Sequence, residues 1–237
     1  MSILPLILEE VSVQAGGRAL LDRVSLEIGA GPKTVILGPN GAGKSLLLRL
    51  CHGLIGPTDG RVLWTGPDAA RSRRRQGMVF QKPVMLRRSV RANVAYGLRL
   101  HKVPSIERGA RIGRVLERTG LTGVANQSAR VLSVGEQQRL ALARVWALEP
   151  EVLFLDEPTA SLDPSGTGAV EQIIQEIHEG GTKIVMTTHD LAQARRVAEE
   201  VIFLHNGRVA EHSDPVAFFT RPESEAASAF LDGRLLW

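Results

Sequence analysis

The sequence predicts an α/β protein with a mostly parallel sheet, an N-terminal antiparallel β subdomain and an inserted helical subdomain. Two strand-like segments, Leu6–Val13 and Ala19–Ile28, flank a Gly16-Gly17 turn, which is typical of an antiparallel hairpin. Residues 89–119 are helical in character and rich in arginine. From residue 134 onward, helix-like and strand-like segments alternate, and this rhythm favours a parallel sheet with helices on both faces.

The segments that follow the hairpin can be assigned in order. Gly31-Pro32 interrupts the chain before a short apolar strand at Thr34–Leu37. A glycine-rich stretch then leads into a helix-like run at Leu46–Leu50. A second turn at 56–60 precedes a strand at Arg61–Trp64.

The inserted region begins near residue 87, and Pro104-Ser105 divides it into two helices, with Ser105 as the expected N-cap of the second. The alternating half is expected to contain helices at Val134–Ala147 and Pro164–Glu179 and strands at Val152–Leu155, Lys183–Thr187 and Val201–Leu204. We expect one domain, 1–237, in which 1–86 and 134–237 form the core and 87–133 form the helical subdomain.

The bulk composition describes a globular chain. Its 237 residues suffice for one large domain, and 43% of them are hydrophobic. No apolar run approaches the ~18 residues that a membrane helix needs. The opening Ile3–Leu8 contains a proline and runs into Glu9-Glu10, so we expect a first strand rather than a secretory signal. The single cysteine, Cys51, favours a reducing compartment and a packed, inert thiol.

The net charge is +4, and the densest group of cations is Arg71, Arg73, Arg74 and Arg75. A solvated loop is the simplest interpretation of this group, and contact with a partner or with lipid headgroups stays open. Nucleic acid is the least favoured partner, because no nucleic-acid-binding module accompanies the cluster.

One stretch has the pattern G-x-x-x-x-G-K-[S/T] between a predicted strand and a predicted helix. It comprises Gly38, Pro39, Asn40, Gly41, Ala42, Gly43, Lys44 and Ser45. In this setting backbone N–H groups and a helix N-terminus can cradle a polyphosphate. Lys44 would reach the β- and γ-phosphates, and Ser45 would hold Mg²⁺. The alternative interpretation, a glycine-rich turn that binds no ligand, is disfavoured between a strand and a helix. The stretch therefore predicts binding of a nucleoside triphosphate.

A second element is the apolar strand that ends in Asp156-Glu157. A buried parallel strand delivers such carboxylates to its C-terminal edge, where ligands bind in open α/β sheets. Asp156 would hold the Mg²⁺ shared with Ser45. Glu157 could polarise the water that attacks the γ-phosphate. A solvated acidic pair before Pro158 is the alternative, and the phosphate loop weakens it.

Further motifs resemble those of the ATP-binding cassette (ABC) ATPases, a family with a P-loop NTPase core. Residues 132–139, Leu-Ser-Val-Gly-Glu-Gln-Gln-Arg, resemble the signature loop of that family. Gln81 matches its Q-loop, Asp163 its D-loop and His189 its switch histidine. The motifs occur in the order of the family, and the resemblance covers nearly the whole chain.

Each of these residues also has a plainer interpretation. Gln81 could be solvated in its loop, and His189 could cap the next helix, a cap that Asp190 could equally provide. Ser133 could be a helix N-cap, with Glu136 completing a capping box. The Ser133 alternative is compatible with a functional role, because the family directs this helix N-terminus at the γ-phosphate.

The resemblance implies that ATP and Mg²⁺ bind in an ATP-dependent, head-to-tail homodimer. Each nucleotide would lie between the phosphate loop of one subunit and Ser133 and Gly135 of the other, with Asp163 nearby. Glu157, His189 and Gln81 would be the catalytic residues, and Gln81 would also join Ser45 and Asp156 at the metal.

The resemblance also implies transmembrane permease subunits, which would dock at 80–94, and indirectly an extracytoplasmic solute-binding protein. The chain would lie on the cytoplasmic face of the inner membrane. The segment 80–94 is similar in style to bacterial importers of small polar solutes, particularly oxyanions such as tungstate and phosphate. An importer of another solute such as an amino acid, an exporter ATPase, a soluble non-transport ATPase and a scaffold with negligible turnover remain open. A P-loop kinase would leave residues 132–139 and Asp163 unexplained.

Two positions depart from the family pattern. Val134 stands where glycine is usual, and a β-branched residue disfavours positive φ, so we expect impaired but not abolished turnover. Ala15 stands near the Gly16-Gly17 turn, where many members carry an aromatic residue that stacks on adenine. Discrimination between bases is therefore expected to be loose, and a strong preference for ATP over GTP would refute this.

Overall fold

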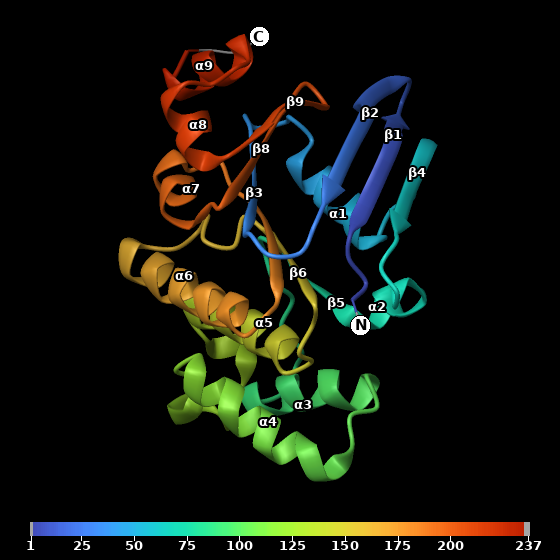
Figure 1. The fold of residues 1–237 in the computed structure, drawn as a ribbon. Helices are drawn as coiled ribbons and strands as arrows, with labels where there is room; N and C mark the ends of the chain where they lie inside the picture. Colours follow the sequence, from blue (N-terminus) through green and yellow to red (C-terminus); the bar gives the residue numbers. More distant parts are fainter. Residues whose placement is uncertain (1, 235–237) are drawn as a thin grey trace.

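The computed structural model describes residues 2–234, and in this part of the chain the strands form two sheets (Figure 1). The smaller sheet is antiparallel and has the order β2-β1-β4, with β1 at Leu6–Ala15, β2 at Arg18–Ile28 and β4 at Asp59–Trp64. Gly16 and Gly17 both have positive φ between β1 and β2, which a tight turn requires. The predicted N-terminal hairpin is confirmed.

The larger sheet has the order β5-β6-β7-β3-β8-β9. Its strands are β3 at Thr34–Leu37, β5 at Gln76–Val79, β6 at Val152–Asp156, β7 at Lys183–Thr187, β8 at Glu200–His205 and β9 at Arg208–Ser213. The first five in spatial order are parallel, and β9 is antiparallel to β8. The mostly parallel sheet is confirmed. Strands β5 and β9 were not predicted, because the short Gln76–Val79 segment and the polar edge strand Arg208–Ser213 carry no continuous apolar run.

Successive residues of the central strands point to opposite faces of the larger sheet, and each face has its own core. On one face, Ile36 and Phe154 join a cluster that includes α1 (Lys44–His52) and β1. On the other face, Leu37 and Leu155 join a cluster that includes α6 (Pro164–Glu179). The sheet is therefore covered on both sides, as parallel sheets are.

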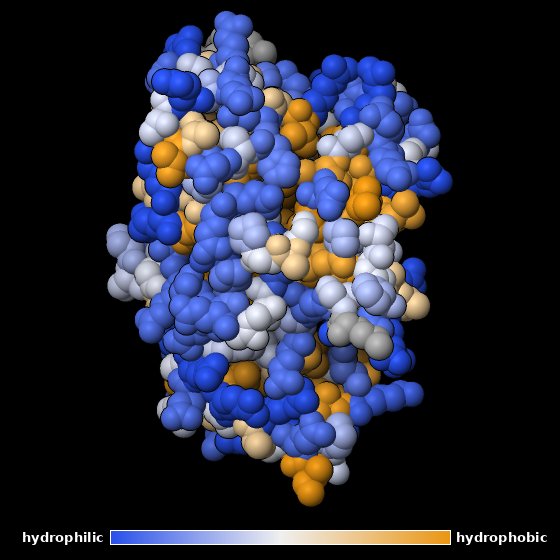
Figure 2. Space-filling view, viewed as in Figure 1, coloured by the Kyte–Doolittle hydropathy of each residue, from blue (hydrophilic) through white to orange (hydrophobic). Residues whose placement is uncertain are grey.

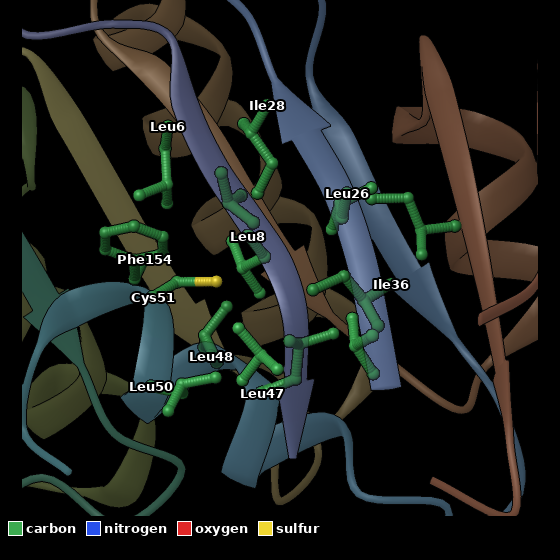
Figure 3. Packing of buried hydrophobic residues seen from close by; sticks show 14 of the residues in the cluster. Leu6, Leu8, Leu26, Ile28, Ile36, Leu47, Leu48, Leu50, Cys51 and Phe154 are labelled. Atoms are coloured by element: carbon green, nitrogen blue, oxygen red, sulfur yellow. The ribbon is translucent and has the colours of Figure 1, made fainter. Parts of the chain in front are cut away.

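Helix α1 lies between the two sheets (Figure 3). Leu47, Leu48 and Leu50 are at most 1% exposed and pack in the same cluster as Phe154 of β6. Cys51 is fully buried there, and burial raises the pKa of its thiol to about 12. The expected packing of this thiol is confirmed. This packing fixes α1 and with it the glycine-rich stretch that precedes the helix.

The inserted region contains α3 at Val90–Leu100 and α4 at Ser105–Arg118, which share a core with α5 at Val134–Trp146. Figure 1 places α3 and α4 at one end of the molecule. Ser105 is the first residue of α4 and not its N-cap, so that expectation is wrong. Pro104, with φ −53° and ψ 139°, occupies the cap position and sets the backbone direction into the helix. The division at residues 87 and 133 stays a prediction.

The remaining helices lie around the larger sheet. They are α2 at Ser72–Arg75, α6 at Pro164–Glu179, α7 at Leu191–Val197, α8 at Pro215–Thr220 and α9 at Glu225–Leu231, and a short 3₁₀ turn at Ala69–Arg71 precedes α2. Two further 3₁₀ turns, at Thr122–Val124 and Ala129–Val131, lie in the inserted region, where Val124 and Ala129 pack with the core of α3, α4 and α5. Helices α8 and α9 were not predicted from the sequence. Across residues 2–234, no helix combines the length and the apolar character needed to cross a bilayer.

Candidate functional site

The glycine-rich stretch 38–45 forms the turn from β3 into α1. A side chain at Gly38 would place its Cβ 2.1 Å from the Leu204 carbonyl oxygen. At Gly43, which caps α1 with φ +102°, a Cβ would lie 2.9 Å from Leu21 Cδ2. Both positions therefore require glycine. Ala42 is buried, and its carbonyl oxygen accepts a 3.1 Å hydrogen bond from Gly207 N, so the stretch is held against β8 and β2.

Lys44 is the first residue of α1, and its side chain is almost completely buried. Its Nζ donates hydrogen bonds of 2.8 Å to Gly38 O and 3.1 Å to Pro39 O. Nζ also lies 3.7 Å from Glu157 Oε1. Burial lowers the pKa of Lys44, and the negative charges of Glu157 and Asp156 oppose that shift. The structure therefore places an ammonium group among the carbonyls of the loop and beside a carboxylate.

Ser45 and Asp156 meet directly, although 111 residues separate them in the chain. Ser45 Oγ donates a 2.6 Å hydrogen bond to Asp156 Oδ1. Thr187 Oγ1, at the end of β7, donates a 3.0 Å bond to the same oxygen. Arg49 lies one helical turn beyond Ser45, and its guanidinium is 3.7 Å from Asp156 Oδ2. Asp156 is 3% exposed, so this carboxylate is both buried and surrounded by donors.

Glu157 follows Asp156 directly and has φ +45°, a left-handed backbone that is uncommon for a residue with a side chain. Its N–H donates a 3.0 Å hydrogen bond to Thr187 Oγ1. Its Oε2 accepts a 3.3 Å bond from Gln81 Nε2 and lies 3.1 Å from His189 Nδ1. The three residues expected to be catalytic, Glu157, Gln81 and His189, are therefore brought together around one carboxylate oxygen.

An open cleft of about 660 Å³ runs along these groups. Its lining comprises Arg18, Ala19, Leu20, Asn40, Gly41, Gly43, Lys44, Ser45, Leu46, Arg49, Gln81, Glu157, Asn206 and Gly207. The lining does not include Gly38, Pro39, Ala42, Asp156 or His189. Ala15 does not line the cleft, but it pairs in register with Arg18, which does line it.

Ser133, Gly135 and Asp163 are not among the residues that line this cleft. Ser133 caps α5 in a capping box, in which its Oγ accepts from Glu136 N (3.3 Å) and its N–H donates to Glu136 Oε2 (2.9 Å). The bond from the Ser133 backbone lowers the pKa of the Glu136 carboxyl. Asp163 caps α6, where its Oδ1 accepts a 2.7 Å bond from Gly166 N. The capping box expected for Ser133 and Glu136 is confirmed. The cap expected at His189 is wrong, because the side chain of Asp190 caps the helix that follows.

Val134 does not adopt the positive φ that the sequence analysis considered. It is the first residue of α5 and does not belong to the residues with positive φ in the described chain. The expected backbone conflict is therefore wrong, because helical geometry suits a valine. The side chain is 57% exposed, so an effect on function must come from its bulk at the helix N-terminus.

The donor set fits a magnesium ion. Mg²⁺ binds hard oxygen ligands, and it usually takes one or two carboxylates or hydroxyls together with substrate phosphates. The Ser45 hydroxyl and the Asp156 carboxylate are such ligands, they are 2.6 Å apart, and Ser45 faces the cleft. The Gln81 side chain lines the same cleft and could add an amide oxygen.

Two residues of this site were missed by the sequence analysis. Thr187 was predicted only as the end of a strand, and Arg49 only as part of a helix. The spacing of Arg49 four residues after Ser45, on one helix face, is the one local signal available. Thr187 reaches Asp156 through the pairing of β6 with β7, which the sequence does not reveal.

A profile described as "ABC transporter" matches residues 21–160 of the chain. A relative from Natronomonas pharaonis, a phosphate import ATP-binding protein, is 37% identical over 93% of this chain and 84% of its own length. A tungstate uptake system ATP-binding protein from Peptoclostridium acidaminophilum is 40% identical over 83% of this chain and 92% of its own length. An Fe(3+) ions import ATP-binding protein from Streptomyces coelicolor is 38% identical over 95% of this chain and 66% of its own length.

One similar solved structure is a dimeric ATP-binding cassette in a post-hydrolysis state, bound to ADP and phosphate. It is 30% identical, has a TM-score of 0.77 and aligns over 89% of this chain and 98% of its own.

Proposed function

The chain belongs to the ABC transporter family, and on that premise we propose that it is the ATP-hydrolysing subunit of a bacterial importer for a small polar solute. As a member of this family it binds and hydrolyses ATP. One observation supports the site assignment above all others. The Ser45 hydroxyl, at the phosphate loop, bonds to the Asp156 carboxylate at 2.6 Å, and Glu157 lies next to it in the chain.

Different residues of the site would perform different parts of ATP hydrolysis. Lys44 and the N–H groups of the loop would bind the phosphates, since both are positioned donors. Ser45 and Asp156, with Gln81, would hold Mg²⁺, which when bound neutralises phosphate charge. Glu157 would accept a proton from the attacking water and orient it. Gln81 and His189, each within 3.3 Å of Glu157 Oε2, would orient that carboxylate.

A second copy of the chain would complete the site. Ser133 is exposed and Gly135 is half-buried, and neither lines the cleft of its own chain, so both are available to another. The post-hydrolysis structure of the relative described above is dimeric. A head-to-tail homodimer would place the α5 N-terminus of one chain against the nucleotide of the other. Loss of the γ-phosphate would weaken that contact, because charge-assisted hydrogen bonds are worth roughly 1.5–3 kcal/mol each.

Permease subunits would dock on the segment 80–94. Asn93 is fully buried and fixes this segment, since its Oδ1 accepts from Leu86 N (3.1 Å) and its Nδ2 donates to the carbonyl oxygens of Leu86, Arg88 and Ser89. The segment exposes Val84 (76%) beside these fixed turns. A rigid, partly apolar platform of this kind suits a partner helix. Such docking would hold the chain at the cytoplasmic face of the membrane.

An oxyanion such as tungstate or phosphate is the solute that we favour. Relatives named for tungstate and phosphate cover most of this chain at 40% and 37% identity. A relative named for iron(III) is 38% identical, so the ATPase alone does not select among these solutes. Recognition would lie in the permease and in an extracytoplasmic solute-binding protein.

Transport can be tested with the tagged chain purified together with the membrane subunits that it retains. The complex is placed in proteoliposomes with its solute-binding protein, loaded with tungstate, phosphate, sulfate or iron(III). We expect an oxyanion to stimulate ATP hydrolysis by the complex. The Lys44→Ala variant should abolish this hydrolysis. Stimulation by iron(III) alone would refute the oxyanion assignment, and failure to retain any membrane subunit would refute the transport function.

A further inference from the structure

One part of the chain carries positive charge without any negative charge. Between Ala69 and Ile106 the sequence has ten Arg and Lys residues and no Asp or Glu. The first carboxylate beyond it, Glu107, is paired with Arg111 at 2.9 Å. The segment includes the exposed face of α3 and the α3–α4 connection, where Arg99 and Lys102 are exposed. Arg75 of this segment is paired with Asp68 and Glu151, so the charge offered to a partner is that of exposed cations such as Arg99 and Lys102. Such exposed cations attract an anionic partner.

The same connection exposes large apolar side chains. Leu100, the last residue of α3, is 68% exposed, and Ile106, in the first turn of α4, is 90% exposed. Figure 2 shows hydrophobic side chains protruding at the lower end of the molecule, where Figure 1 places α4 and the α3–α4 connection. Hydrophilic residues surround them in that view. A side chain exposed to this degree projects from the surface, whereas a residue in a binding groove would be partly covered.

The connection that carries these side chains is firmly held. Val103 N donates a 2.9 Å hydrogen bond to Leu98 O, and Arg108 Nε donates a 2.7 Å bond to Val103 O. Val103 also packs against the core shared by α3, α4 and α5. Leu100 and Ile106 are therefore presented from a rigid support, which reduces the entropy lost when a partner covers them.

We propose that the α3–α4 connection binds the surface of an anionic lipid bilayer, with Leu100 and Ile106 inserted at the boundary between headgroups and acyl chains. Arg99 and Lys102 would bind the headgroup phosphates. A fluid bilayer accepts protruding apolar side chains, while a protein partner would need a matching cavity. Cytoplasmic leaflets are anionic, and each nearby Lys or Arg is attracted to them. This contact is separate from the permease platform at 80–94 and from the ATP cleft.

The test uses the purified chain alone and flotation with two kinds of vesicle, phosphatidylcholine alone and phosphatidylcholine mixed with phosphatidylglycerol. We expect binding to the anionic vesicles only. Leu100→Ser combined with Ile106→Ser should abolish it. Arg99→Gln and Lys102→Gln should each weaken it by about fivefold, the usual effect of one cation near an anionic surface. Val216→Ser, which alters an equally exposed valine (71%) on α8, should change nothing.

Two results would overturn the proposal. One is an absence of binding to anionic vesicles by the unaltered chain, and the other is binding that the Leu100/Ile106 variant retains. If the unaltered chain does not bind vesicles, but the Leu100/Ile106 variant no longer co-purifies with its membrane subunits, the α3–α4 connection binds protein and not lipid. The basal ATPase rate and the melting temperature of each variant are measured in parallel. An unchanged ATPase rate in a variant that no longer binds vesicles shows that the membrane contact is lost while the proposed ATPase function is retained.

Discussion

Ser45 Oγ donates a 2.6 Å hydrogen bond to Asp156 Oδ1, and this bond joins the first turn of α1 to the end of β6. The two residues belong to separate sequence motifs, and each motif alone has a plain structural interpretation. Their contact shows that the phosphate loop and the acidic strand end form one site. The first prediction follows from this pairing.

Ser45→Ala should lower ATP turnover by roughly a hundredfold, because it removes one of the hard oxygen ligands expected for Mg²⁺ and metal-based charge stabilisation is worth several kcal/mol. The measurement is phosphate release at a series of Mg²⁺ concentrations. The variant should need more Mg²⁺ than the unaltered chain. Ser228→Ala, at a serine of α9 that does not line the cleft, serves as the control. Unchanged turnover in the Ser45 variant would remove this hydroxyl from the site.

Thr187→Val should reduce turnover by about tenfold, since Thr187 Oγ1 both donates to Asp156 Oδ1 and accepts from Glu157 N, each at 3.0 Å. The hydroxyl thus positions both carboxylates, while valine keeps the shape of the side chain. The reduction should appear in kcat more than in KM for ATP. Thr187→Ser should restore most of the rate, and a serine variant no better than valine would argue against a positioning role.

Val134→Gly should raise turnover by about fivefold, the factor that corresponds to ~1 kcal/mol of steric conflict. Because Val134 is helical, the gain should come from loss of side-chain bulk and not from backbone freedom. Val134→Ala should therefore give most of the same increase. Turnover that is unchanged or lower in both variants would show that the valine does not hinder the site.

Glu200 should make folding stability depend on pH in the acid range. Burial opposes its ionisation, but hydrogen bonds from His212 and Thr34 and the charge of Lys183 hold the pKa of Glu200 at about 2, below the ordinary value of 4.5. A group with a lowered folded-state pKa stabilises the protein above its unfolded pKa, and the stabilisation disappears as the pH falls toward the folded value. The window is therefore pH 4.5 to about 2.

The variant Glu200→Gln removes this contribution, which is on the order of 3 kcal/mol at neutral pH. Urea unfolding at pH 7 and at pH 3 should show a smaller difference in unfolding free energy for the variant than for the unaltered chain. Glu225→Gln, at the exposed start of α9, is the matched control. Parallel pH profiles for Glu200→Gln and the unaltered chain would contradict the assignment.

The elements that sequence reasoning predicted well are those determined by local patterns. Thr34–Leu37, Pro164–Glu179 and Lys183–Thr187 occur with the predicted bounds, because an apolar run or a proline with an N-cap marks each of them. The glycine-rich stretch was also predicted, since Gly38 and Gly43 serve a backbone need that only glycine meets.

The features that sequence reasoning missed depend on contacts made in three dimensions. Strand β5 is recognisable only through its pairing with β6, and Thr187 enters the site only because β7 lies next to β6. The pattern of Pro104-Ser105 suggested a serine cap, but the proline itself occupies that position. The backbone of Val134 could be judged only after α5 was known to begin there.

The central claim is that two copies of this chain close on ATP through the exposed start of α5. The most direct test is light scattering of a Glu157→Gln variant, which should bind ATP and fail to hydrolyse it. We expect a monomer without nucleotide and twice that mass with ATP, and Ser133→Arg in the same background should prevent the doubling. A chain that remains monomeric at saturating ATP, with binding confirmed, would contradict the claim.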